Sequence, residues 1–302
     1  MKLSIGLALG GGGARGAAHI GVLQVLHEAG IRFNRISGTS VGSIVGAMYA
    51  YKNDPDWIEQ QFKEFMETPD FIAMGTARVL EDRNPHSAIG QMAKYIRDRF
   101  VLIMSKQKSF IIKRSRLEKA IRFLVPAKSF SDLLIPLEVN VTDLQKGESV
   151  LIDSGDLIDA LVQSSTIPGY VQPTQRGNQI LVDGGIINPV PVKGLKNKVD
   201  YIIALSITKK KLPEFENRNM YEILTRSDQI TSNYLAKARL EHADYVIHPD
   251  VGGFHWSRFD QFDRLLTNGR EAAELNLSEL INDLRIKSSF FYQWKQKLGF
   301  TK

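Results

Sequence analysis

The chain has 302 residues, 43% of them hydrophobic and 24% charged, which is ordinary for a folded globular protein with a sizeable core. Cysteine is absent, and this excludes disulfides and thiolate metal sites. No uncharged apolar stretch reaches about 18 residues, so we expect no membrane-spanning helix. The formal net charge of +6 points to an anionic partner only if the positive charge is concentrated in one place.

The first fifty residues alternate between strand and helix patterns. An apolar strand is predicted over residues 3–9, a helix over 17–29, a second short strand over 33–36 and a second helix over 43–51. Residues 1–9 carry one positive charge and run directly into a glycine cluster, which favours a first strand over a signal peptide and hence a cytoplasmic location. This alternation predicts a parallel sheet.

The turn after the second strand carries the first candidate for chemistry. Gly38-Thr39-Ser40-Val41-Gly42 matches G-x-S-x-G between a strand and a helix, the setting of a nucleophile elbow that exposes a serine hydroxyl. A plain glycine-serine turn that leads into a helix has the same pattern, so the pentapeptide alone is a weak signal.

The rest of the chain continues the α/β pattern after an interruption. A helix is predicted over 55–66, and residues 70–130 form a less regular, mainly helical insertion or cap. Further strands are predicted over 137–141, 150–152, 179–182, 201–205 and 245–247, and helices over 156–164, 220–243 and 268–283. Without repeats or linkers, we expect a single domain over 1–302, with its core in about 3–210 and a C-terminal tail over 286–302.

The glycine cluster at residues 10–16 has two interpretations. Gly11, Gly13 and Gly16 satisfy G-x-G-x-x-G, but residues 33–38 lack the acidic residue that a dinucleotide site needs after its second strand. The alternative is a group of backbone amides at a helix N-terminus that binds an oxyanion. Arg15 would lie at the mouth of this loop and either anchor it or contact substrate.

A serine nucleophile needs a base, and Asp183 is the best candidate. It ends an apolar strand before Gly184 and Gly185, which predicts a carboxylate at the carboxyl edge of the sheet, beside the elbow. A structural Asp-Gly-Gly turn is the alternative. Among six histidines, His248 is the alternative base because it ends a strand late in the chain.

The glycine loop, the elbow and Asp-Gly-Gly occur in this order, and together with Ser164-x-x-x-Pro168 they resemble the patatin-like phospholipase family over about residues 3–210. The resemblance implies a three-layer α/β/α sandwich with a mostly parallel sheet, and hydrolysis of glycerolipid acyl esters without metal or cofactor. It implies Ser40 as nucleophile, Asp183 as base and the amides of Gly11, Gly12, Gly13 and Val41 as oxyanion hole. The supporting motif residues are Arg15, Gly16, Gly38, Gly42, Gly184 and Gly185.

Positive charge gathers in one segment and in the tail. Residues 94–128 carry eleven Lys and Arg against two acids and include apolar patches at 101–104 and 110–112, while 286–302 combine five aromatic residues with four lysines and no acid. Both compositions predict a peripheral contact with an anionic membrane, such as the inner face of the cell membrane. A solvated face for the segment, and a tail packed on the core or on a second subunit of a homo-oligomer, are the alternatives.

Two other functions stay open at this point. A soluble carboxylesterase or acyltransferase would use the same Ser–Asp dyad without an interface, and a non-catalytic nucleotide- or lipid-binding module would be indifferent to Ser40→Ala. No nucleic acid partner is expected, since no recognised binding motif accompanies the charge.

Overall fold

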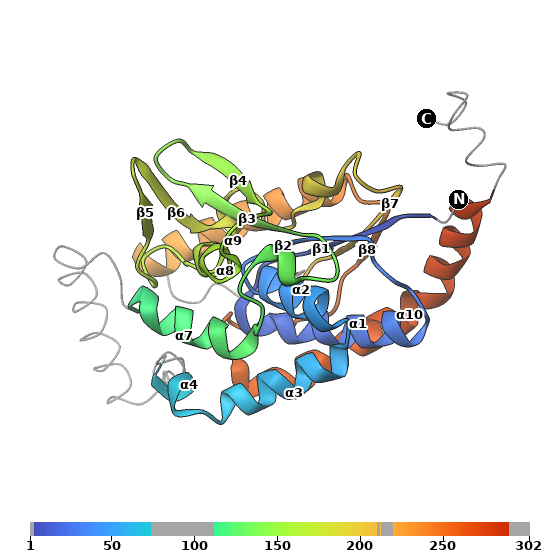
Figure 1. The fold of residues 1–302 in the computed structure, drawn as a ribbon, viewed down its shortest axis with the longest axis horizontal. Helices are drawn as coiled ribbons and strands as arrows, with labels where there is room; N and C mark the ends of the chain where they lie inside the picture. Colours follow the sequence, from blue (N-terminus) through green and yellow to red (C-terminus); the bar gives the residue numbers. More distant parts are fainter. Residues whose placement is uncertain (1–2, 74–111, 210–211, 213–219, 290–302) are drawn as a thin grey trace.

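A computed structural model describes residues 3–73, 112–209, 212 and 220–289 of the chain. In this part, eight strands form one mixed sheet in the order β5-β6-β3-β2-β1-β7-β8, with β4 paired to β3 outside that path (Figure 1). The strands are β1 Ile5–Leu9, β2 Arg35–Thr39, β3 Leu137–Asp143, β4 Glu148–Ile152, β5 Thr174–Arg176, β6 Gln179–Asp183, β7 Tyr201–Leu205 and β8 Tyr245–Ile247.

The described helices follow the sequence pattern closely. They are α1 Ala17–Glu28, α2 Val41–Lys52, α3 Pro55–Met66, α4 Pro69–Ala73, α7 Arg114–Leu124, α8 Leu157–Ser164, α9 Met220–Leu240 and α10 Phe262–Ser288. Helix α3 has the predicted bounds because Asp54 caps it by accepting a hydrogen bond from the Trp57 amide, and Pro55 occupies its first turn.

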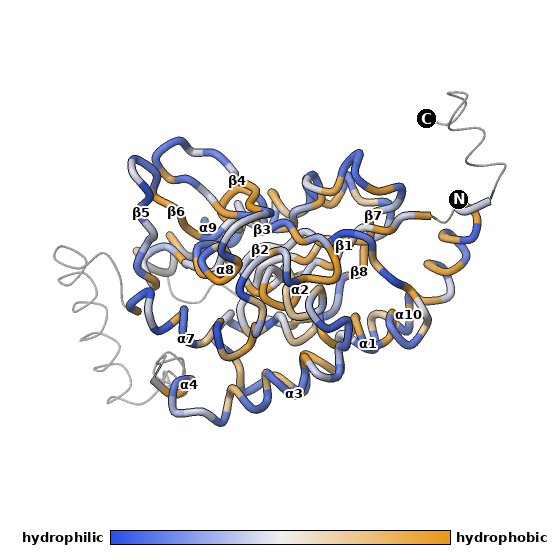
Figure 2. The backbone as a smooth tube through the Cα atoms, in the orientation of Figure 1, coloured by the Kyte–Doolittle hydropathy of each residue, from blue (hydrophilic) through white to orange (hydrophobic). Residues whose placement is uncertain are grey.

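The sheet is buried on both faces, which confirms the predicted three-layer α/β/α arrangement. In β7, Tyr201, Ile203 and Leu205 face the larger core, whereas Ile202 and Ala204 face a smaller one. Helices α1, α2, α3 and α10 cover the larger core, and α9 contributes Ala236 to the smaller (Figure 1). Figure 2 shows hydrophobic residues gathered in the middle of the molecule and hydrophilic loop tips beside β4 and β5.

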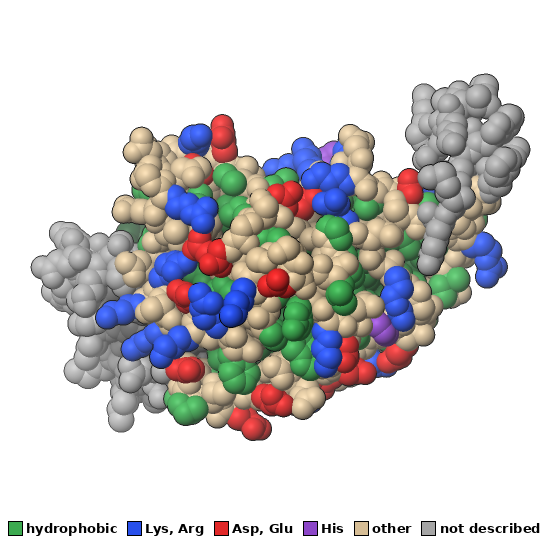
Figure 3. All heavy atoms as spheres, viewed as in Figure 1, with side chains coloured by type: hydrophobic (Ala, Val, Ile, Leu, Met, Phe, Trp, Pro, Cys, Tyr) green, Lys and Arg blue, Asp and Glu red, His purple; other side chains and the backbone are tan. Residues whose placement is uncertain are grey.

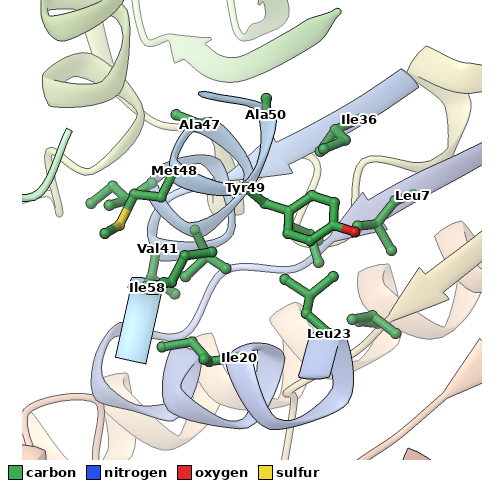
Figure 4. Packing of buried hydrophobic residues seen from close by; sticks show 14 of the residues in the cluster. Leu7, Ile20, Leu23, Ile36, Val41, Ala47, Met48, Tyr49, Ala50 and Ile58 are labelled. Atoms are coloured by element: carbon green, nitrogen blue, oxygen red, sulfur yellow. The ribbon is translucent and has the colours of Figure 1, made fainter. Parts of the chain in front are cut away.

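Helices α1 and α2 form the centre of the larger core. Tyr49 of α2 points toward Leu7 of β1, and Leu23 of α1 lies on its other side (Figure 4). The outer surface of α1 packs on α10, and each helix has a glycine at the contact. A methyl group on Gly21 would collide with the carbonyl of Leu266, and one on Gly269 with the carbonyl of Ala18. The C-terminal helix is thereby in backbone contact with the first helix.

Strand β3 brings two distant strand ends together. Strand β4 pairs with residues 139–143 of β3 and occupies one of its edges. The other edge is shared, since β2 pairs with 137–140 in parallel and β6 pairs with 141–143 in the antiparallel direction. Strands β2 and β6 therefore run toward each other, and their carboxyl ends meet where Asn140 adjoins Val141. Asp183 was expected beside the elbow as the end of a parallel strand; it lies there as the end of an antiparallel one.

The predicted basic segment is only partly described, because 74–111 fall outside the described residues, as do 290–302 of the tail. In the described remainder, two arginines of α7 are paired: Arg114 bonds Glu118 and Asp159, and Arg122 bonds Glu118. The same helix also carries Arg116 and Lys119. Figure 3 shows basic and acidic side chains interleaved over this region.

None of the helices in the described ranges is long and apolar enough to cross a membrane.

Candidate active site

Ser40 occupies a sharp turn between β2 and α2. Its backbone has φ 53° and ψ −127°, a left-handed conformation that is uncommon outside glycine and typical of a nucleophile elbow. The turn requires flanking glycines, because a methyl group on Gly42 would collide with the Leu9 carbonyl oxygen, and one on Gly38 with the first turn of α2. The predicted elbow is therefore present in its expected strand–turn–helix setting.

The Asp183 carboxylate lies against the Ser40 side chain. Burial raises the pKa of Asp183 to about 6, while the hydrogen bonds from the Ser40 hydroxyl and the Gly185 amide act in the opposite direction. The Gly185 amide donates to Oδ1 over 2.8 Å. The neighbouring Gly184 packs on the Asn140 carbonyl, so the turn after β6 lies directly on β3. This geometry provides a proton acceptor whose pKa lies close to neutrality.

Ser164, the last residue of α8, holds the elbow in place. Its Oγ accepts a hydrogen bond from the Ser40 amide at 2.9 Å and donates to the Asn140 carbonyl at 2.6 Å. The sequence shows this serine only as part of the Ser-x-x-x-Pro block, and no spacing rule predicts that it bonds a residue 124 positions away. The contact links α8, β3 and the elbow.

Two asparagines extend this network beyond what the sequence predicts. Asn140 donates from Nδ2 to the Gly38 carbonyl, and Asn188 donates to Asn140 Oδ1 at 2.9 Å. The Thr39 hydroxyl donates to the Asn188 carbonyl at 2.8 Å. The segment after Asp183 is thus fastened to the strand that delivers Ser40, which fixes the two side chains relative to each other.

The glycine loop lies beside Ser40, with Gly11 packed on its Cβ and Gly16 on Val41. One expectation changes here: the Gly11 amide donates to the Pro189 carbonyl at 3.0 Å, so its single hydrogen is already used. Within the described residues the amides of Gly12 and Gly13 have no acceptor, and the amide of Val41 belongs to the first turn of α2, where N–H groups lack intrahelical partners. These three amides remain as candidate oxyanion donors.

Two side chains and one backbone carbonyl hold the glycine loop in place by hydrogen bonds. Arg15 donates from Nε to the Gly12 carbonyl at 3.1 Å, which is the anchoring role, and burial lowers its pKa to about 10. Buried His19 donates from Nε2 to the Gly10 carbonyl at 2.8 Å, and burial lowers its pKa to about 4. The Ala14 amide donates to the Trp256 carbonyl at 2.6 Å, a contact to a part of the chain where no site residue was predicted.

The alternative base, His248, lies elsewhere. It follows β8, three strand positions from β2, or roughly 14 Å at the usual strand spacing. Its Nε2 donates to the Thr208 carbonyl at 2.9 Å. Within the described residues no histidine is among the groups that set the pKa of Asp183, and no group of three or more acidic or histidine side chains there could hold a metal ion.

Positive charge lies near the loop. Burial and the charges of Arg15 and Arg226 lower the pKa of Lys209 to about 8. Burial and the charges of Lys209 and Arg15 lower the pKa of His255 to about 4. Arg15, Lys209 and His255 are therefore close enough for the positive charges of Arg15 and Lys209 to act on their neighbours.

An α/β/α sandwich with a serine elbow, a facing aspartate and a glycine loop defines the class of this protein. The sequence model described as "Patatin-like phospholipase" matches residues 7–196, more than half of the chain. The chain belongs to the patatin-like phospholipase family.

Curated relatives agree with this assignment. An uncharacterized NTE family protein of Mycobacterium tuberculosis is 32% identical over 204 residues, covering 67% of this chain and 49% of the relative. Human patatin-like phospholipase domain-containing protein 6 is 28% identical over 252 residues, covering 82% of this chain and 16% of the relative. The chain spans about half the length of the mycobacterial relatives it matches, and less of the human one.

Solved structures support the fold. VipD from Legionella pneumophila aligns with a TM-score of 0.50 and 17% identity, covering 92% of this chain and 67% of VipD. Human GIVD cytosolic phospholipase A2 aligns with a TM-score of 0.50 and 11% identity, covering 94% of this chain and 60% of that protein.

Proposed function

We propose that this protein hydrolyses fatty-acyl esters of phospholipids or lysophospholipids, with Ser40 as nucleophile and Asp183 as base. The proposal is carried by the Ser40 hydroxyl, which lies close enough to the buried Asp183 carboxylate to lower its pKa. Family membership supports a lipid ester as substrate. The sequence-based expectation of a cytoplasmic protein at the membrane surface belongs to the same proposal.

The first chemical step is acylation of Ser40. Its Oγ attacks the ester carbonyl carbon while its proton moves to the Asp183 carboxylate, and the tetrahedral intermediate then expels the alcohol, which takes that proton. A pKa of about 6 suits this exchange, since the carboxylate is ionised at neutral pH yet is more basic than an exposed one. The second step repeats the sequence with water, releasing the fatty acid and restoring Ser40.

The negative charge that develops on the carbonyl oxygen needs donors that are in place beforehand. The amides of Gly12, Gly13 and Val41 fulfil that role in the proposal. Each such donor contributes on the order of 10²–10³ in rate. The contacts of Arg15 with Gly12 and of His19 with Gly10 hold the loop that carries two of these amides.

The charge at the mouth favours a phosphate-containing lipid over a neutral glyceride. Arg15 and Lys209 are the cations near the loop, and a phosphodiester would reduce the repulsion between them. Acyl-chain length and the ester position cleaved are not set by these charges.

The decisive experiment is labelling with a fluorophosphonate ester, read by intact mass, on the wild type, Ser40→Ala and Asp183→Asn. We expect one adduct on the wild type and none on Ser40→Ala. Asp183→Asn should label and hydrolyse more slowly by about 10³-fold or more, because the nucleophile loses its base while the shape is kept. Fatty-acid release from phosphatidylcholine and lysophosphatidylcholine, compared with a soluble p-nitrophenyl ester, then defines the substrate class.

Each contrary result has a distinct meaning. No adduct on the folded wild type contradicts an active serine and supports a non-catalytic binding module. Near-wild-type activity of Asp183→Asn contradicts the assigned base. Turnover of the soluble ester alone, with lipids untouched, supports a carboxylesterase.

A further inference from the structure

Helix α9 presents a stripe of apolar side chains to solvent. We call these residues the α9 stripe; with their exposed fractions they are Met220 (61%), Ile223 (49%), Leu224 (62%), Ile230 (42%) and Tyr234 (75%). At about 100° per residue they fall within an arc of about 120° on the helix. The opposite side of the helix packs on the molecule through buried Ala236. The stripe is therefore one outward side of the helix, interrupted by exposed Ser227 and Thr231, and not a set of scattered exposed residues.

The helix that carries the stripe lies on loops that build the candidate site. Asn233 donates from Nδ2 to the carbonyl of Lys209, four residues past the end of β7. Arg239 donates to the carbonyl of Ile187, four residues past Asp183. Ile186, in the same loop, is 41% exposed and adds a further apolar side chain near the site. Helix α9 thus joins the stripe to the segments that follow β6 and β7.

Positive charge borders the stripe along one edge of the helix. Arg226 and Lys237 are eleven residues apart, which places them on the same edge of the helix beside Ile230. Asp228 lies on the other edge. The charge of Arg226 lowers the pKa of Lys209, and the charge of Lys209 lowers the pKa of His255. The cations therefore extend from α9 to the glycine loop.

We propose that the α9 stripe docks on an anionic lipid surface, with Met220, Leu224 and Tyr234 entering the headgroup layer. The apolar face, a tyrosine near its centre and flanking cations are what an interfacial helix requires. The inference rests on the proposed lipid-hydrolase function and adds the surface through which the enzyme meets its substrate. It places this contact on α9, whereas the sequence favoured residues 94–128 and 286–302.

A lipid surface fits the stripe better than a second copy of the chain does. A two-fold interface would bring the same patch of both copies together. With the two helices antiparallel, the edge that carries Arg226 and Lys237 would face the same edge of the other copy and the cations would repel, whereas anionic headgroups attract them.

The test compares two double variants. Leu224→Ser with Tyr234→Ser removes part of the stripe. Leu144→Ser with Leu275→Ser removes two exposed leucines elsewhere, at 47% and 85% exposure. Both proteins are sedimented with vesicles of phosphatidylcholine and phosphatidylglycerol. We expect the stripe variant to lose about ten-fold or more in vesicle partitioning and the control to stay within about two-fold. Fluorophosphonate labelling and soluble-ester turnover should be equal in both, which shows that the fold is intact.

Unchanged vesicle binding by the stripe variant overturns the proposal. A wild type that is dimeric by light scattering, with a monomeric stripe variant, also overturns it and assigns the stripe to a subunit interface. If the stripe mediates vesicle binding but the wild type neither labels nor hydrolyses esters, the docking surface stands and the hydrolase function fails.

Discussion

At the residue scale, the Asp183 carboxylate destabilises the fold when it is ionised. Burial raises its pKa to about 6, so the folded chain binds this proton more tightly than the unfolded chain does. The stabilisation that the neutral acid provides is complete below about pH 4 and is lost as the pH rises through about 6. At neutral pH the folded protein therefore holds an ionised group that burial disfavours.

Replacing this group should stabilise the protein. The amide introduced by Asp183→Asn is neutral at every pH, and its carbonyl oxygen can accept the hydrogen bonds of Gly185 and Ser40. We expect the substitution to raise the free energy of unfolding relative to wild type, by an amount that grows between about pH 4 and 6 and levels off at about 2–3 kcal/mol. Urea denaturation at about pH 4, 6 and 8 measures the difference. An equal or lower stability of the variant at the highest pH would contradict the raised pKa.

The sequence predicted the turn at Ser40 but not every contact around it. The elbow around Ser40 was predictable because its strand, turn and helix are adjacent in sequence. The use of the Gly11 amide was not, since its acceptor, the Pro189 carbonyl, belongs to a much later segment that has no sequence signal of this contact.

At the scale of elements, α8 acts on the elbow through its last residue. The hydrogen bonds of Ser164 to the Ser40 amide and the Asn140 carbonyl surround a serine with a strained backbone. Such strain persists only where the surrounding structure enforces it. The end of α8 therefore positions the Ser40 turn.

Two adjacent serines test this role. Ser164→Ala leaves the Ser40 amide without its acceptor, so we expect a loss of about 1–3 kcal/mol in stability and about 10–100-fold in kcat, with KM little changed. Ser165→Ala is the matched control, because its buried Oγ has no hydrogen-bond partner within the described residues. The control should be neutral or slightly stabilising. Equal effects of the two substitutions on the rate of fluorophosphonate labelling would refute a positioning role for Ser164.

Most elements were predictable because they follow from local patterns of burial. The strand at Tyr201–Leu205 and the helix at Pro55–Met66 are examples. The direction of β6 was not predictable, because a short apolar run reads the same in a parallel or an antiparallel pair. The exposed face of α9 was also missed, since a helix pattern does not show which face meets a partner.

At the scale of the whole molecule, helices α1 and α10, which lie near the two ends of the described chain, pack directly on each other. Helix α10 packs on α1 where Gly21 faces the Leu266 carbonyl and Gly269 faces the Ala18 carbonyl, and Arg270 pairs with Glu28 at 3.1 Å. The N-terminal end of α1 carries the glycine loop. Disturbing the C-terminal helix should therefore affect the candidate site as well as stability.

Gly269→Ala tests this packing. The change that we expect in the free energy of unfolding is opposite to the one that helix propensity alone predicts. Alanine is favoured over glycine inside a helix by about 1 kcal/mol, yet Gly269→Ala would push α10 away from the Ala18 carbonyl. We expect a net loss of about 1–3 kcal/mol in the free energy of unfolding and a lower Tm, both measurable by thermal and urea denaturation.

Gly253→Ala is the control, because open space surrounds Gly253 and its backbone is not left-handed. It should change stability by less than about 0.5 kcal/mol. A Gly269→Ala protein as stable as wild type would show that α10 packs less closely than the structure indicates.

The meeting of β2 and β6 on one edge of β3 also sets how much of the chain must be synthesised before the candidate site can assemble. A chain that has emerged only as far as α3 contains the Ser40 turn but lacks β3, Ser164 and Asp183. Ser40 then has neither Asp183 beside it nor the Ser164 contact that holds its strained backbone. Ser40 and Asp183 come together only after β6 has been made and has paired with β3, so an N-terminal fragment released early lacks the assembled candidate site.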